Sequence, residues 1–188
     1  MRVVERLLWR SRLPVSMSEG FHPKVRMSFP SALALGVSGD AEVLELDLTE
    51  NLETDMVLQA LNVGSVEGLL FFQARKIPEG SPKARIVSET YKMRIPERFC
   101  QKTACLIDHF LLQTSVSGIK TNGKCVDVRA AVNVLELLND LLTMELAVTT
   151  GSDAGFREVL DQIELRDELF RTIFPVRVSV HLAENEKQ

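Results

Sequence analysis

One polar stretch near the start of the chain concentrates residue types that can do chemistry. Residues 13–28 contain hydroxyls, a carboxylate, an imidazole and two cations, and the centre of the stretch is SEGFHPK at residues 18–24. Histidine can bind an anion or transfer a proton near neutral pH, and cations beside it would strengthen anion binding. The candidate anion-binding or RNA-binding residues of this stretch are Ser18, Gly20, Phe21, His22, Lys24 and Arg26.

A second candidate surface precedes this loop. Arg2, Arg6 and Arg10 recur every four residues, so a helix over residues 3–13 would align them in one stripe with Trp9 close by. Guanidinium groups hold phosphates and aromatic rings stack on nucleobases. Arg2, Arg6, Trp9 and Arg10 therefore complete the candidate set. The alternative is an ordinary solvated helix face, with Trp9 covered by an N-terminal segment that is absent from this sequence.

The distribution of charge favours a local affinity for anions. The chain has 188 residues and a net charge of −4. Residues 1–30 contain six cations and two acids, a net charge of +4, so the remainder carries −8. An acidic chain is poorly suited to coating DNA without specificity, whereas a basic patch within it can still attract phosphates.

Several other classes of site find little support in the sequence. No G-x-S-x-G elbow surrounds Ser18 or Ser28, which argues against a hydrolase. Cys105 and His109 share a predicted helix face, but two ligands without a second pair make a poor metal site. We therefore predict no catalytic residue, no metal ion and no cofactor. The odd number of cysteines and the lack of a long apolar run predict a cytoplasmic protein that does not enter a membrane.

Breakers and hydrophobic periodicity divide the chain into two parts. The cluster PEGSP at residues 78–82 is the clearest breaker. It predicts an N-terminal unit over residues 1–77, a linker over 78–85 and a C-terminal unit over 86–188. The patterns predict helices over residues 3–13, 53–62, 97–112 and 156–170, and extended segments over 27–35, 41–48, 68–74, 87–95, 113–119, 126–137, 141–149 and 176–182. The apolar run 132–144 also fits a helix.

The order of these elements predicts an α+β fold. The second half approximates the β-α-β-β-α-β order of the ferredoxin-like, split βαβ unit, and the first half has that order without its opening strand. We therefore expect two tandem ferredoxin-like units, the first missing one strand. Because that strand lies inside the sheet, its absence would leave backbone groups unpaired. The strand would be borrowed from another chain, the gap would close, or the N-terminus would be truncated.

The loop also carries a resemblance to a known family. SEGFHPK, followed by RMS at residues 26–28 and ALGV at 34–37, resembles the signature of the radical-SAM-associated (radical-SAM-linked) uncharacterised protein family. The run AEVLELD at 41–47 fits that family too, and a weaker match includes VDVR at 126–129 and Arg177. Family members usually begin with a strand and a Ser-His-Leu-Asp-like segment, which this sequence lacks.

The resemblance implies partners rather than a reaction. The family occurs fused to, or encoded beside, cobalamin-binding radical SAM proteins, and often near ribonuclease G and ribosomal-protein genes. A radical SAM protein and RNA are therefore the expected partners. The chain is not itself a radical SAM catalyst, because Cys100, Cys105 and Cys125 lack the C-x3-C-x2-C spacing that would hold the cluster.

These observations give one leading hypothesis and two alternatives. The leading hypothesis is a non-catalytic module that binds RNA, or presents it to a radical SAM partner, through the basic helix and the loop. The first alternative is an enzyme or half-site in which His22, Lys24 and Arg26 hold a small anionic substrate. The second is a structural adaptor whose basic face docks an acidic protein.

Overall fold

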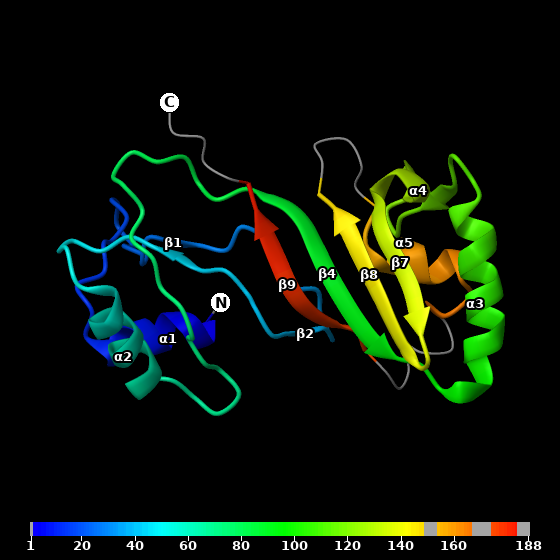
Figure 1. Ribbon diagram of the computed structural model, residues 1–188. Coiled ribbons are helices and arrows are strands. Elements are labelled where there is room, and N and C mark those ends of the chain that lie inside the picture. The colour runs from blue at the N-terminus through cyan, green and yellow to red at the C-terminus, as the bar shows by residue number, and fades with distance from the viewer. Residues whose placement is uncertain (1, 149–153, 167–173, 184–188) are drawn as a thin grey trace. The chain divides into compact units, whose positions relative to one another are not determined.

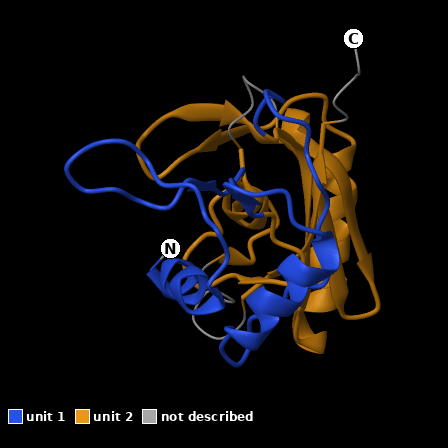
Figure 2. Cartoon of the chain, turned by 90° about the vertical axis from the view of Figure 1, so that its left-hand side faces the viewer, with its two compact units in different colours: residues 1–30, 44–83 blue, residues 31–43, 84–188 orange. Residues whose placement is uncertain are grey.

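The computed structural model describes residues 2–148, 154–166 and 174–183, and its elements have the mixed α+β character that the sequence predicts (Figure 1). The chain forms two units (Figure 2). The first contains residues 1–30 and 44–83, and the second contains residues 31–43 and 84–188. The segment 31–43 therefore belongs to the second unit although it interrupts the sequence of the first.

The second unit is built on a five-stranded sheet with the order β2-β9-β4-β8-β7 (Figure 1). Neighbouring strands are antiparallel, except that β2 pairs with β9 in parallel. The strands span Ser38–Gly39 (β2), Ile86–Arg94 (β4), Val132–Leu138 (β7), Leu141–Ala147 (β8) and Val176–Leu182 (β9).

Three helices and a small inserted hairpin complete this unit. The order β4-α3-β7-β8-α5-β9 is that of a split βαβ unit, with further elements between α3 and β7. The helices are Glu97–Leu111 (α3), Val128–Ala131 (α4) and Phe156–Gln162 (α5), and the inserted hairpin is Ser117–Ile119 (β5) with Cys125–Asp127 (β6). The sequence predicts a helix to residue 170, but residues 167–170 lie outside the described part of the chain. Residue 149, the predicted end of the strand that corresponds to β8, lies outside it too.

The core of the second unit lies between the helices and one face of the sheet. Tyr91 of β4 pairs with Met144 of β8, and both side chains are buried. Alternate residues on each strand share a face of the sheet. Apolar side chains from α3 and α5 pack against the face that carries Tyr91 and Met144. The helices contribute Ile107, Phe110, Phe156, Val159 and Leu160 to the cluster.

The first unit has two helices and a two-stranded ladder. Helix α1 spans Arg2–Ser11 and α2 spans Thr54–Val63, while β1 (Met27–Ser28) pairs antiparallel with β3 (Glu45–Leu46). The extended segments predicted over 27–35 and 41–48 therefore form only short strands. The core of this unit has four buried leucines, Leu7, Leu8, Leu13 and Leu61. The structure supplies no second ferredoxin-like sheet for this unit within its described residues, so the tandem arrangement stays a prediction.

The predicted strand over residues 68–74 is wrong. This segment forms no ladder, and two of its apolar side chains, Leu70 and Phe72, are 72% and 62% exposed. The side chain of Asn62 bonds to the segment instead: its Nδ2 donates to the carbonyl of Phe71 (2.8 Å), and its Oδ1 accepts from the N–H of Phe71 (2.9 Å). An amide side chain thus takes the place that a neighbouring strand would have.

Candidate functional site

The loop of residues 18–24 is the tip of a small hairpin in the first unit. Met17 and Val25 form an antiparallel bridge below it. The N–H of Ser18 donates to the carbonyl of Lys24 (2.7 Å), and the N–H of Lys24 donates to Oγ of Ser18 (2.9 Å). The hydroxyl of Ser18 therefore closes the loop, which is a structural role.

Most side chains of this tip face solvent. Phe21 is fully exposed, and His22 and Lys24 are also exposed. Gly20 has a φ of 120°, a conformation that residues with a Cβ rarely adopt, so the turn requires glycine there. An exposed ring beside a cation and an imidazole is suited to a partner that covers the tip from outside.

Arg26 lies at the base of the hairpin and is engaged by an acid of the same unit. Its Nε is 3.3 Å from Oδ2 of Asp47, and both side chains are more than half exposed. An exposed pair of this kind contributes up to about 1 kcal/mol and is weakened by salt. Arg26 therefore adds less positive charge to the surface than the sequence suggests.

Helix α1 carries the predicted arginine stripe, but the side chain of Arg10 is hydrogen-bonded within the unit. Arg2, Arg6 and Trp9 are exposed, with 63% of the Trp9 surface accessible. Arg10 donates from Nε (3.1 Å) and Nη2 (2.9 Å) to the carbonyl of Gly64, which caps the end of α2. Arg10 thus links the two helices, and Arg2, Arg6 and Trp9 form the exposed face of α1.

The two candidate surfaces belong to the same unit without touching through polar groups. Across the described residues, no hydrogen bond or ion pair joins the side chains of the α1 face to those of the loop, and no ion pair involves Arg2, Arg6, His22 or Lys24. These four polar side chains are therefore available to a ligand.

The most elaborate polar cluster of the second unit surrounds Arg177, which is not among the residues that the sequence pattern singles out as a site. The guanidinium of Arg177 on β9 is 1% exposed. Its Nε donates to Oε1 of Glu42 (2.8 Å) and its Nη2 pairs with Oε2 of the same carboxylate. Its Nη1 donates to Oε1 of Glu89 (2.8 Å) and to Oγ of Ser31 (2.8 Å). One buried cation therefore ties the segment 31–43 to β4 and β9.

Tyr91 extends the cluster. Its hydroxyl donates to Oε2 of Glu89 (2.6 Å), and Ser31 donates to the other oxygen (2.6 Å). Burial, together with the hydrogen bond to Glu89, raises the pKa of Tyr91 above its usual range. The guanidinium nitrogens of Arg177 all have partners here, so we assign the cluster to structure. The only sequence signal was an arginine between the valines of a predicted strand.

Asp127 also has a structural role. Its Oδ1 accepts from the backbone N–H groups of Val116 (3.1 Å), Arg129 (3.0 Å) and Ala130 (3.3 Å), so it caps α4. Ser115 donates to Oδ2 (2.7 Å). The Ser115 hydroxyl, followed by these N–H groups, lowers the pKa of Asp127.

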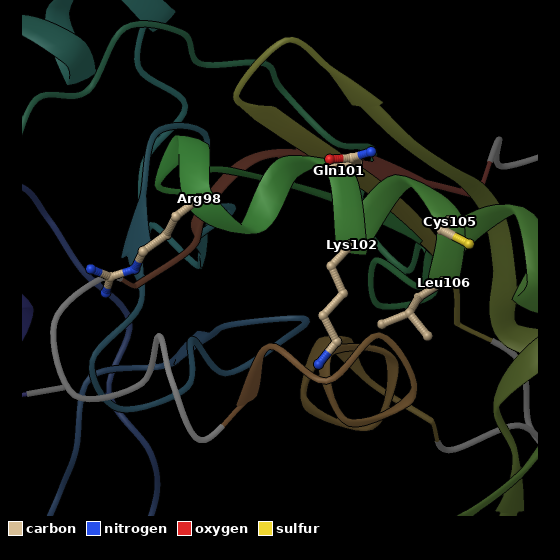
Figure 3. A pocket seen from close by; sticks show the side chains of 5 residues that line it. All are labelled: Arg98, Gln101, Lys102, Cys105 and Leu106. Atoms are coloured by element: carbon tan, nitrogen blue, oxygen red, sulfur yellow. The ribbon is translucent and has the colours of Figure 1, made fainter.

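Helix α3 borders an open hollow in the second unit (Figure 3). Lys102 forms an ion pair with Glu164 (2.5 Å), and the thiol-bearing Cys105 is exposed. The residues lining the hollow are Arg98, Gln101, Lys102, Cys105 and Leu106. Within the described ranges, no three His, Cys, Asp or Glu side chains are grouped to hold a metal ion. The hollow therefore shows no built cofactor site.

The comparisons with known proteins give one family and no described activity. A family model described as an uncharacterized protein conserved in bacteria (DUF2344) matches residues 1–157. No curated protein and no solved structure matches the chain. In the part of the chain that is described, no helix has both the length and the apolar character needed to cross a bilayer.

Proposed function

We propose that this chain, which belongs to the family of uncharacterized proteins conserved in bacteria (DUF2344), binds RNA through the first unit. The RNA-binding surface consists of the exposed α1 face (Arg2, Arg6 and Trp9) and the loop tip (Phe21, His22 and Lys24). The observation that carries the proposal is the 63% exposure of Trp9 beside two arginines that pair with no acid in the described residues.

The combination of residue types favours RNA over an ordinary solvated face. Exposed arginines alone are common on helices, whereas a tryptophan usually buries most of its large apolar surface. Leaving that ring and the Phe21 ring in water has a free-energy cost, which a ligand that stacks on them would recover. Phosphates would then be bound by Arg2, Arg6 and Lys24.

The sheet of the second unit lacks the features of a nucleic-acid platform. Sheet proteins that bind RNA stack bases on aromatic side chains of the open sheet face. The four long strands contain no tryptophan or phenylalanine and one tyrosine, Tyr91, which is buried and bonded to Glu89, so the imidazole of His181 is the only exposed ring on them. The proposed RNA contacts are therefore placed on the first unit.

The exposure of the loop distinguishes RNA from a small anionic substrate. Sites for small molecules enclose most of the ligand in a concave pocket. His22 and Lys24 are instead exposed at a hairpin tip, and the Ser18 hydroxyl is used to close the loop. This arrangement suits an extended partner that lies across the tip.

The wider proposal includes the partner and the architecture that the sequence suggests. We propose that the chain presents RNA to a radical SAM protein, on the basis of the family resemblance of the loop. We also propose that the first unit is a ferredoxin-like unit without its opening strand, since it has the order α1-β1-β3-α2. Three free cysteines support a reducing, cytoplasmic location.

Filter binding with tRNA and ribosomal RNA fragments tests the RNA proposal. We expect Arg2→Glu and Arg6→Glu each to weaken binding and to reduce the dependence of log K on log salt by about 0.7 to 0.9 per lost phosphate contact. Arg75→Glu is the matched control, because Arg75 is an exposed arginine of the same unit outside the proposed surface. Equal effects of all three substitutions, or no binding by the wild-type protein, would refute the proposal.

The radical SAM partnership needs a separate measurement. Co-purification from cells that express both proteins, repeated after nuclease treatment, would detect a direct complex. Recovery of the partner only while RNA is intact would instead indicate that RNA bridges the two proteins, and failure to recover it in either case would end this part of the proposal.

A further inference from the structure

We infer that the RNA segment bound by the first unit is single-stranded, with unpaired bases stacked on Trp9 and Phe21. This inference rests on the proposed RNA-binding function and specifies the ligand of that same surface. Its basis is the position of the two aromatic side chains, because each is exposed and lies among cations, and the indole N–H of Trp9 is the only polar group on the two rings.

Phe21 gives the clearest indication. Its ring is fully exposed at the hairpin tip, and the loop is closed beneath it by the two hydrogen bonds between Ser18 and Lys24. A phenylalanine ring offers only an apolar, flat surface. Such a ring can stack on the face of a base but cannot form hydrogen bonds with base edges.

Base pairing removes the faces that these rings would contact. In an RNA duplex, bases are stacked on one another, and the deep, narrow major groove is closed to side chains. Double-stranded RNA is recognised mainly through hydroxyls and phosphates across the minor groove. Trp9 and Phe21 would contribute little to that mode, whereas each can hold one unstacked base.

The positive charges around the rings suit a flexible backbone. Arg2 and Arg6 are separated by about 6 Å along the axis of α1, given a rise of about 1.5 Å per residue, and Lys24 lies at the closed base of the loop. Arg26 is paired with Asp47, and the guanidinium of Arg10 is directed to the carbonyl of Gly64, so Arg2, Arg6 and Lys24 are the cations that we assign to the RNA backbone. Stacking must therefore supply a large share of the affinity, which predicts moderate salt dependence.

Trp9 is the only tryptophan of the chain, so intrinsic fluorescence reports directly on this contact. The titration uses an oligouridylate of about 12 nucleotides. A parallel titration uses the blunt duplex that this strand forms with an oligoadenylate of the same length. We expect the single strand to quench Trp9 fluorescence and to bind at least about 10-fold more tightly than the duplex. By filter binding, Trp9→Leu and Phe21→Leu should each weaken single-strand binding by about 5-fold to 100-fold, the effect of losing one stacked base.

Phe72→Leu serves as the matched control, since Phe72 is an exposed phenylalanine of the same unit that lies outside this surface. Equal binding of duplex and single strand that is lost in Arg6→Glu but unchanged in Phe21→Leu would overturn the inference and leave the proposed function standing. Absence of binding to either RNA would overturn both. A circular dichroism spectrum unchanged from wild type confirms that each variant is folded.

Discussion

Arg177 and Glu42, which are 135 positions apart in the sequence, form a two-point pair in which Nε donates to Oε1 and Nη2 contacts Oε2. The pair fixes the segment 31–43 against the sheet of the second unit. Because the guanidinium is almost completely buried and also bonds to Glu89, it compensates two carboxylates at once.

Removing this cation should destabilise the protein strongly. Arg177→Met leaves Glu42 and Glu89 without their positive partner in a largely buried place, so we expect a loss of about 3 kcal/mol or more in the free energy of unfolding. Urea denaturation measures this loss. Arg94→Met is the control, because the exposed pair between Arg94 and Asp140 should contribute less than about 1 kcal/mol. Similar losses in the two variants would contradict the structural role of Arg177.

The raised pKa of Tyr91 predicts a loss of stability at alkaline pH. The unfolded chain releases this proton near pH 10, as ordinary tyrosine does, whereas the folded protein retains it to higher pH. The stabilisation is therefore fully present below about pH 10 and is lost as the pH rises toward the folded value. Tyr91 is the only tyrosine, so phenolate absorbance follows it directly and should appear only as the protein unfolds.

Comparison with Tyr91→Phe isolates this effect from the titration of lysines. Above about pH 10, the free energy of unfolding should fall more steeply with pH in the wild type than in Tyr91→Phe. The difference between the two slopes should reach up to about 1.4 kcal/mol per pH unit, the value for one proton. Parallel pH profiles of the two proteins, or phenolate absorbance at pH 10 in the folded state, would contradict the prediction.

Asn62 should stabilise the first unit more than an exposed asparagine stabilises the second. Asn62→Ala removes both hydrogen bonds to the Phe71 backbone and leaves partly buried groups unpaired, at a cost of about 1 to 3 kcal/mol. Asn133→Ala, which removes an exposed hydrogen bond to Glu145, should change stability by less than about 0.5 kcal/mol. The urea midpoints of the two variants measure this difference, and equal midpoints would argue against the contact.

The end of α1 offers a stabilising substitution. Arg12 follows the helix with a φ of 55°, which a residue with a Cβ adopts at a cost of about 1 kcal/mol. Arg12→Gly should therefore raise the melting temperature, with a gain of up to about 1 kcal/mol. Arg12→Ala removes the same charge but retains the Cβ, so it should give no such gain. A higher melting temperature for the alanine variant than for the glycine variant would contradict this interpretation.

Elements with a clear local pattern could be predicted from the sequence. The alternation in residues 176–182 predicted β9 with its observed bounds, and the α3 prediction over 97–112 differs by one residue at its end. The loop at 18–24 could also be located, because Gly, Pro and polar residues define it. These features depend on neighbours in the sequence.

Features that depend on distant parts of the chain could not be predicted. Four apolar residues at 69–72 have the pattern of a buried strand, yet without a pairing strand Leu70 and Phe72 are exposed. Arg10 and Arg26 are of a residue type that is typical of binding surfaces. In the structure, Arg10 donates to the carbonyl of Gly64 and Arg26 forms an ion pair with Asp47. The burial of Arg177 depends on Glu42, and local periodicity contains no information about that contact.

The path of the backbone determines how the protein can be divided for separate study. The chain passes from one unit to the other three times, at residues 30–31, 43–44 and 83–84. A fragment that begins at Ala84 would keep Arg177 and Glu89 but lack Ser31 and Glu42. Expression of the second unit by itself therefore calls for a fused gene in which residues 31–43 are joined by a short designed linker to residue 84, because no single truncation yields it intact.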